Sequence, residues 1–194
     1  MTNHLTMATA PTGGTLADAV AAIEAATAGP PASEQARAQT LDFVAAHDDA
    51  LHRSCLEGHL TGSALVFDHK RERTLLMLHA KLGKWLQPGG HADGEGHLGS
   101  VALKEATEET GIEGLRLVTP AVDCDVHTIP ARKGVPEHVH LDVRFVVIAP
   151  EGAVEQGNHE SNALRWCTLD EVVEIAGDES LVRLARSGFG AHHR

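Results

Sequence analysis

Hydrophobic and polar positions divide the chain into a helical start and a strand-rich remainder. Residues Leu16 to Ala28 are rich in alanine, with apolar residues on one side, which predicts a short helix. Ser33 stands where it would cap a second helix that runs to about Ala46. The first residues are rich in Thr, Ala, Pro and Gly, a composition typical of a frayed terminus. We therefore expect a disordered tail over residues 1–15 and an N-terminal helical appendage over residues 16–58.

Short apolar runs and period-two alternation predict strands through most of the remaining chain. The first two flank a polar turn, so an antiparallel pair is expected there. Another helix is expected from about Leu98 to Thr110, with Gly111 ending it in the left-handed conformation. The expected strands are Leu60 to Phe67, Thr74 to His79, Leu115 to Thr119, Val122 to Ile129, His138 to Ala149 and Leu164 to Thr168.

A capping box, Thr168-Leu169-Asp170-Glu171, predicts a further helix near the C-terminus. The order of elements is then helices, strands, one central helix, more strands and terminal helices. This order favours an α/β or α+β sandwich, in which a mixed β-sheet is packed between helices. We assign residues 59–194 to this domain.

Composition narrows the class of function. The net charge is −11 and the 16 basic residues are not concentrated in any stretch, which argues against a nucleic-acid partner. An anionic nucleotide substrate would need metal cations to reverse the local field. Neither a signal peptide nor an apolar run of the ~18 residues that a membrane helix needs is found, so we expect a cytoplasmic protein without a membrane partner. The three widely spaced cysteines are interpreted as buried thiols.

Three glutamates on the central helix are the main candidates for chemistry. Glu105, Glu108 and Glu109 stand at positions i, i+3 and i+4, so their carboxylates share one face. Like charges so placed repel one another, and a bound Mg²⁺ or Mn²⁺ would remove that conflict because hard cations prefer oxygen ligands. An exposed acidic helix would show the same spacing. The preceding loop, residues 89–96, contains four glycines and would let backbone N–H groups approach an anion closely, which favours the metal site.

Together these segments resemble the Nudix box of the MutT-like hydrolases. Gly90 fits its first glycine, the three glutamates fit its acidic triplet, and Gly111-Ile112 fits its end. The resemblance implies a Nudix-type sandwich and metal-dependent hydrolysis of a phosphoanhydride (pyrophosphate) bond in a nucleoside diphosphate linked to another moiety. It also implies Mg²⁺ or Mn²⁺ held by Glu105, Glu108, Glu109 and a carbonyl near Gly90. Glu108 and Glu109 are then the first candidates for the general base, and Glu160 is a weaker one.

The chain departs from the Nudix pattern at two positions. Counting back from Glu105, the first glutamate of the box falls on Gly96, and its arginine is Lys104. Counting forward from Gly89 instead, Glu95 is found after five residues, but eight residues then separate it from Lys104. An insertion of one residue after Glu95 would reconcile the two counts. Glu95 and Lys104 are therefore expected to brace the loop against the helix, with the weaker hold that Lys has compared with Arg.

A strand near residue 140 carries the second set of candidates. His138, His140, Asp142 and Arg144 alternate with apolar residues, as in a strand that forms the floor of a cleft, although any half-exposed strand shows this pattern. We expect His138, His140 and Arg144, with His91 beside Gly90, to bind substrate.

Two other functions remain open. A non-hydrolytic Nudix domain that binds or senses nucleotides would not need all three glutamates. An isoprenyl-diphosphate isomerase shares the fold, but no cysteine here stands beside a recognisable companion motif. The expected partner is a small nucleotide-type substrate. The N-terminal helices could cover a sheet edge, cap the site or form a homodimer.

Overall fold

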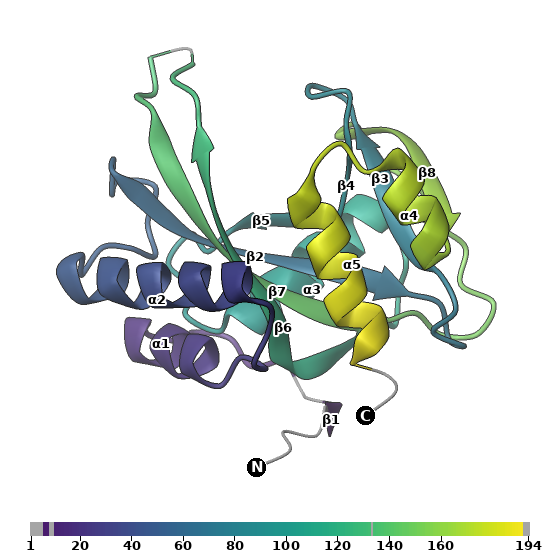
Figure 1. Cartoon of the computed structure of the whole chain (residues 1–194), viewed down its shortest axis with the longest axis horizontal. Coiled ribbons are helices and arrows are strands. Elements are labelled where there is room, and N and C mark those ends of the chain that lie inside the picture. Colours follow the sequence, from purple (N-terminus) through teal and green to yellow (C-terminus); the bar gives the residue numbers. More distant parts are fainter. Residues whose placement is uncertain (1–5, 8–9, 133, 192–194) are drawn as a thin grey trace.

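A computed structural model describes residues 6–7, 10–132 and 134–191 (Figure 1). Within these residues one mixed β-sheet has helices on both faces. The helices are α1 (Leu16–Glu24), α2 (Pro31–Ala46), α3 (Leu98–Thr110), α4 (Leu169–Ile175) and α5 (Glu179–Gly190). The strands are β1 (Thr6–Met7), β2 (Gly58–Phe67), β3 (Thr74–His79), β4 (Trp85–Leu86), β5 (Gly89–His91), β6 (Arg116–Ile129), β7 (His138–Ile148) and β8 (Ser161–Cys167).

Strand β2 lies at the centre of this sheet. It pairs in parallel with β7 along its whole length, and it pairs antiparallel with β5 near Thr61 and with β3 near Val66. The sheet order is β1-β6-β7-β2-β3-β4, with β5 attached to β2 and β8 attached to β3. The predicted antiparallel pair and the mixed sheet are both confirmed.

Residues of β2 with opposite side-chain directions show that α3 and α5 cover opposite faces of the sheet. A Cβ atom added to Gly62 would lie 2.6 Å from a carbonyl oxygen of α3, whereas a Cβ added to Gly188 of α5 would meet Leu65 and Phe67. Residues 62 and 65 differ by an odd number, so their side-chain directions are opposite. Figure 1 shows α5 in front of the sheet and α3 behind it. The predicted sandwich is confirmed.

The two N-terminal helices share their core with the sheet. Ile23 of α1 and Val44 of α2 belong to the same buried cluster as Leu60 and Phe145. Helix α2 begins at Pro31, so the predicted cap at Ser33 is wrong. Proline suits the first helical turn because its missing N–H has no partner there in any case.

Ser33 instead lies buried inside helix α2 and joins it to the sheet. Its hydroxyl accepts a hydrogen bond of 3.1 Å from the backbone N–H of Cys124. Helix α1 ends at Glu24, earlier than the predicted Ala28. The N-terminal helices are therefore fixed to β6 by polar as well as apolar contacts.

The described part of the predicted tail makes specific hydrogen bonds. Thr6–Met7 pairs with β6, and the N–H groups of Gly13 and Gly14 donate to Glu95 at 2.6 and 2.7 Å. A carboxylate therefore binds the backbone of this segment at Gly13 and Gly14, while the disordered tail and the domain bounds stay predictions. Residues 1–5 and 8–9 lie outside the described residues.

The other local predictions have mixed outcomes. The two strands expected at 115–119 and 122–129 are one strand, β6, with an irregularity that sets residues 119–122 opposite Phe145. Gly111 ends α3 with φ at 66°, and the Thr168 capping box forms, both as predicted. All three cysteines are free and buried, also as predicted. In the described residues, we find no helix with the length and apolar character needed to cross a membrane.

Candidate active site

Two facing glycines bring the β5 loop and helix α3 into close contact. Gly90 pairs with Gly62 of β2, and α3 crosses β2 at that point. A Cβ atom on Gly90 would lie 2.5 Å from the carboxyl carbon of Glu105. Any larger residue at position 90 would therefore displace this carboxylate. The glycines predicted to open the loop allow the acidic face of α3 to lie directly against its backbone.

The three glutamates share one face of α3, as the spacing predicts, but their burial differs. The Glu108 side chain is 57% exposed and that of Glu105 19%, while Glu109 is buried. Lys104 lies beside the two more exposed carboxylates, with its Nζ 3.1 Å from Glu105 and 3.6 Å from Glu108. The acidic face is therefore open at Glu108 and closed at Glu109.

The carboxyl group of Glu109 is strongly perturbed by its surroundings. Burial raises its pKa to about 7, and the charges of Glu160 and Glu105 contribute to the rise. The N–H of Gly89 donates to its Oε2 at 3.0 Å, which opposes the shift. Glu160 is held nearby because its carbonyl accepts the N–H of Ala80. A hard divalent cation fits this arrangement, since it would relieve the repulsion among the neighbouring carboxylate oxygens.

Arg144 does not line a binding surface, so its predicted role in substrate binding is wrong. Its side chain is 5% exposed and is enclosed by carboxylates. The guanidinium donates to Asp142 at 2.8 Å and to Asp123 at 3.2 Å, and it lies 3.0 Å from Asp125. A further bond to the Ser180 hydroxyl, at 2.8 Å, occupies it on the side of α5. Every nitrogen of this side chain is thus engaged within the protein.

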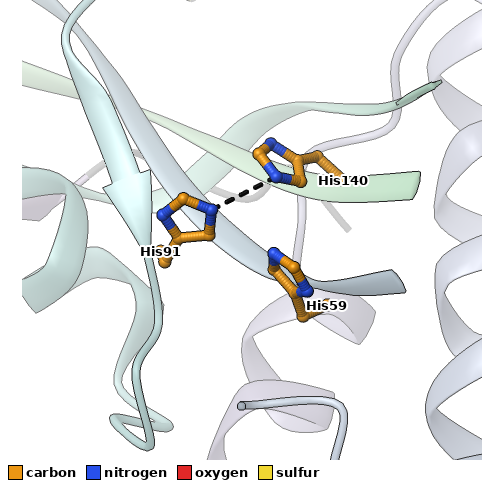
Figure 2. Close-up of side chains that lie close together, drawn as sticks. All are labelled: His59, His91 and His140. Carbon is orange, nitrogen blue, oxygen red and sulfur yellow. Dashed lines mark hydrogen bonds between the residues drawn. The ribbon is translucent and has the colours of Figure 1, made fainter. Parts of the chain in front are cut away.

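The histidines predicted from the alternation do lie together. His91 and His140 approach to 3.2 Å between their Nε2 atoms, and the ring of His138 lies 5.3 Å from that of His140. Sequence reasoning missed His59, whose ring centroid lies 5.0 Å from each of these three. Figure 2 shows His59 with His91 and His140. The parallel register that sets His59 beside His140 joins residues 81 positions apart, which no local pattern reveals.

Comparison with known proteins identifies the family. A family model described as the NUDIX domain matches residues 59–186. A MutT-like protein of Streptomyces ambofaciens is 31% identical over 140 residues, which cover 70% of this chain and 82% of that protein. The chain belongs to the Nudix hydrolase family. The predicted family and enzyme class are thereby confirmed.

Solved Nudix structures share the fold at lower sequence identity. An Ap4A hydrolase of C. elegans in a binary complex has a TM-score of 0.56 and 22% identity, over 69% of this chain and 96% of that one. A NUDIX family hydrolase from Clostridium perfringens has a TM-score of 0.50 and 20% identity, over 68% of this chain and 96% of that one. At these identities the likeness concerns the fold alone.

The brace between Glu95 and Lys104, predicted from the Nudix box, does not form, and that prediction is wrong. Glu95 accepts N–H bonds from Gly13, Gly14 and His97, while Lys104 pairs with Glu105.

Gly96 stands where the count back from Glu105 places the first glutamate of the Nudix box, and the structure gives a steric reason for a glycine there. A Cβ there would lie 1.9 Å from the carbonyl oxygen of Thr15, because the N-terminal segment crosses the loop at this residue. Glu95 therefore fixes the glycine-rich loop of residues 89–96 to the segment before α1.

Proposed function

We propose that this Nudix hydrolase cleaves a phosphoanhydride bond in a nucleoside diphosphate linked to another moiety, with Mg²⁺ or Mn²⁺ as cofactor. The buried Glu109 carries the proposal. The pKa of its carboxyl group is about 7, and two further carboxylates lie beside it. Burying such a group destabilises the fold, so a helix with a structural role alone would not need it. A site that binds a cation and handles a proton near neutral pH accounts for it.

The proposed metal ligands are Glu105, Glu108, Glu109 and the carbonyl oxygen of Gly90. All of them offer oxygen, which Mg²⁺ and Mn²⁺ prefer. The close approach of Glu105 to Gly90 supports a shared ligand set. When bound, the cation would neutralise charge on the phosphates and polarise the bond that breaks.

The chain's own contribution is proton transfer and positioning. Of the three candidate bases, Glu109 is the buried carboxyl group of α3, and it lies beside Glu160. We propose that it accepts the proton of the attacking water. The charge of Glu160 and a side-chain hydrogen bond from it both act on the Glu109 carboxyl. Glu108, which is more exposed, is the alternative base.

Product release from a panel of compounds tests this proposal. The panel contains dinucleoside polyphosphates, nucleotide sugars and nucleoside triphosphates, each with Mg²⁺ or Mn²⁺, and nucleoside monophosphate and phosphate are measured. We expect release from at least one class, and we expect Glu109→Gln to lower kcat by about 10²- to 10⁴-fold. Glu113→Gln is the matched control, because Glu113 is exposed and follows the end of α3.

Release that persists in Glu109→Gln at the wild-type rate would contradict the assignment of the base. If no compound is cleaved but a nucleotide still binds, the chain is a non-hydrolytic sensor instead. Substrate contacts by His91, His138 and His140, a homodimer and a cytoplasmic location stay predictions.

A further inference from the structure

Three imidazole rings from three different strands converge on one point. His59 belongs to β2, His91 to β5 and His140 to β7, and one ring nitrogen from each lies within 4.8 Å of the others. Figure 2 shows the rings turned toward a common space between the strands. Backbone pairing fixes this arrangement, since residue 59 pairs with 140 and residue 61 pairs with 91. The strand pairing therefore places the three histidines side by side.

His59 carries a buried nitrogen without a partner. Only 5% of the residue is exposed, and its Nε2 has no hydrogen-bond partner among the described residues. Its Nδ1 lies 3.4 Å from the carbonyl oxygen of Cys55, which favours the proton on Nδ1 and a free lone pair on Nε2. An unpaired buried nitrogen costs free energy, and a cation in the common space would remove that cost.

His91 and His140 have a spacing close to that of two ligands on one ion. Their Nε2 atoms are 3.2 Å apart. Zinc-to-nitrogen bonds of ~2.0–2.1 Å in a tetrahedron set two ligand nitrogens about 3.3 Å apart.

The surroundings hold the cluster in place without adding a strong charge. The Nδ1 of His138 lies 2.9 Å from the carbonyl oxygen of Pro136, and its ring stacks on His59. Arg53, a nearby cation, is neutralised by Asp93 at 2.6 Å. A divalent cation in the common space would thus meet imidazole rings and a compensated ion pair.

The cluster is separate from the carboxylate site. His91 and Gly90 are neighbours on β5, so their side-chain directions are opposite, and Gly90 faces Glu105. The two sites also differ in chemistry, because carboxylates suit Mg²⁺ and Mn²⁺ whereas imidazoles suit Zn²⁺.

We propose that His59, His91 and His140 form a second metal site, which binds Zn²⁺ through three imidazole nitrogens and leaves the fourth position to water. His91 and His140 are only partly buried, so the open position faces solvent on their side. Three protein ligands with one open position is the coordination found in zinc sites that bind an exchangeable ligand.

Metal binding to chelator-treated full-length protein tests the proposal without any measurement of hydrolysis. We expect one Zn²⁺ per chain to be retained after desalting, and Co²⁺ to give the intense visible absorption of a tetrahedral site. His140→Gln should weaken Zn²⁺ binding by at least about 100-fold, since even the loss of an outer-sphere partner costs roughly 10–100-fold. His91→Gln, at the more open side, is a second variant in case the first does not fold.

Two controls separate this site from other metal binding. His69→Gln removes an exposed histidine in a turn and should leave the affinity unchanged. Glu105→Gln with Glu108→Gln alters the carboxylate site and should also leave Zn²⁺ binding and the Co²⁺ spectrum unchanged. The proposal is overturned if wild type retains no Zn²⁺, if the Co²⁺ spectrum is octahedral, or if the glutamate variant loses Zn²⁺ while His140→Gln keeps it.

Discussion

Replacing Arg144 by Met should destabilise the fold far more than it alters substrate binding. In the wild type, Arg144 and Arg183 face the carboxylates of Asp123, Asp125 and Asp142, all of which are buried. Arg144 is enclosed by these groups, so in its absence water would not solvate the buried carboxylates. The effect should therefore appear in the free energy of unfolding.

The structure sets the size of this effect. Three carboxylates and two guanidiniums carry a formal charge of −1, and the Met variant would leave −2 on the same buried groups. Removing one partner of a buried ion pair costs about 3–5 kcal/mol because the remaining charges stay unpaired. For a chain of this size, that corresponds to a fall in Tm of about 6–20 °C.

Urea denaturation measures the free energy of unfolding of each variant, and KM is measured separately on the folded enzyme. Adding Asp142→Asn should restore part of the loss, by roughly 0.5–3 kcal/mol, because it removes one of the uncompensated charges. Arg165→Met is the matched control, since Arg165 forms an exposed pair with Glu171 and such pairs contribute little. If Arg144→Met is no less stable than Arg165→Met but has a raised KM, Arg144 binds substrate and the reasoning is refuted.

Three further predictions concern the loop and helix of the carboxylate site. Ionisation of Glu109 is costly only in the folded state, where its pKa is about 7 instead of 4.5, so metal-free protein should lose about 3 kcal/mol of stability between pH 4.5 and 7. Glu109→Gln should remove this pH dependence in urea titrations, and an unchanged slope would contradict it. Gly62→Ala should destabilise the fold by about 1–3 kcal/mol and slow hydrolysis, because the new Cβ would push α3 away from β2. Gly190→Ala, which meets nothing within 4 Å, should do neither, and equal effects of the two would refute the steric argument. Glu95→Ala should make the amide of Gly14 exchange with solvent several-fold faster, as measured by hydrogen exchange; unchanged protection would show that other contacts hold the segment.

Local sequence signals were sufficient for the elements that depend on local chemistry. Helix α3, its end at Gly111 and the capping box at Thr168 form as predicted. Each depends on residues within a few positions of one another, so no tertiary contact is needed to specify it. The shared face of Glu105, Glu108 and Glu109 follows from the same helical period.

Alternation along β7 showed which residues share a face but not what covers that face. His140 and Arg144 lie on the same side of the strand, yet Arg144 lies under α5 among carboxylates while His140 belongs to the open histidine cluster. The difference comes from residues more than 30 positions away, such as Ser180. The error about Arg144 arose because period-two alternation contains no information on the neighbouring layer.

By itself the sequence determined the family, the central helix and the order of its three glutamates, because these follow from spacing along one element. Only the tertiary structure decided that Glu109 is the buried member of the triplet and that Glu160 lies beside it. The tertiary structure also brings His59 together with His91 and His140. The physical reason is common to these cases. Burial and cross-strand neighbours depend on which segments the fold brings together, and both the pKa of Glu109 and the histidine cluster depend on them.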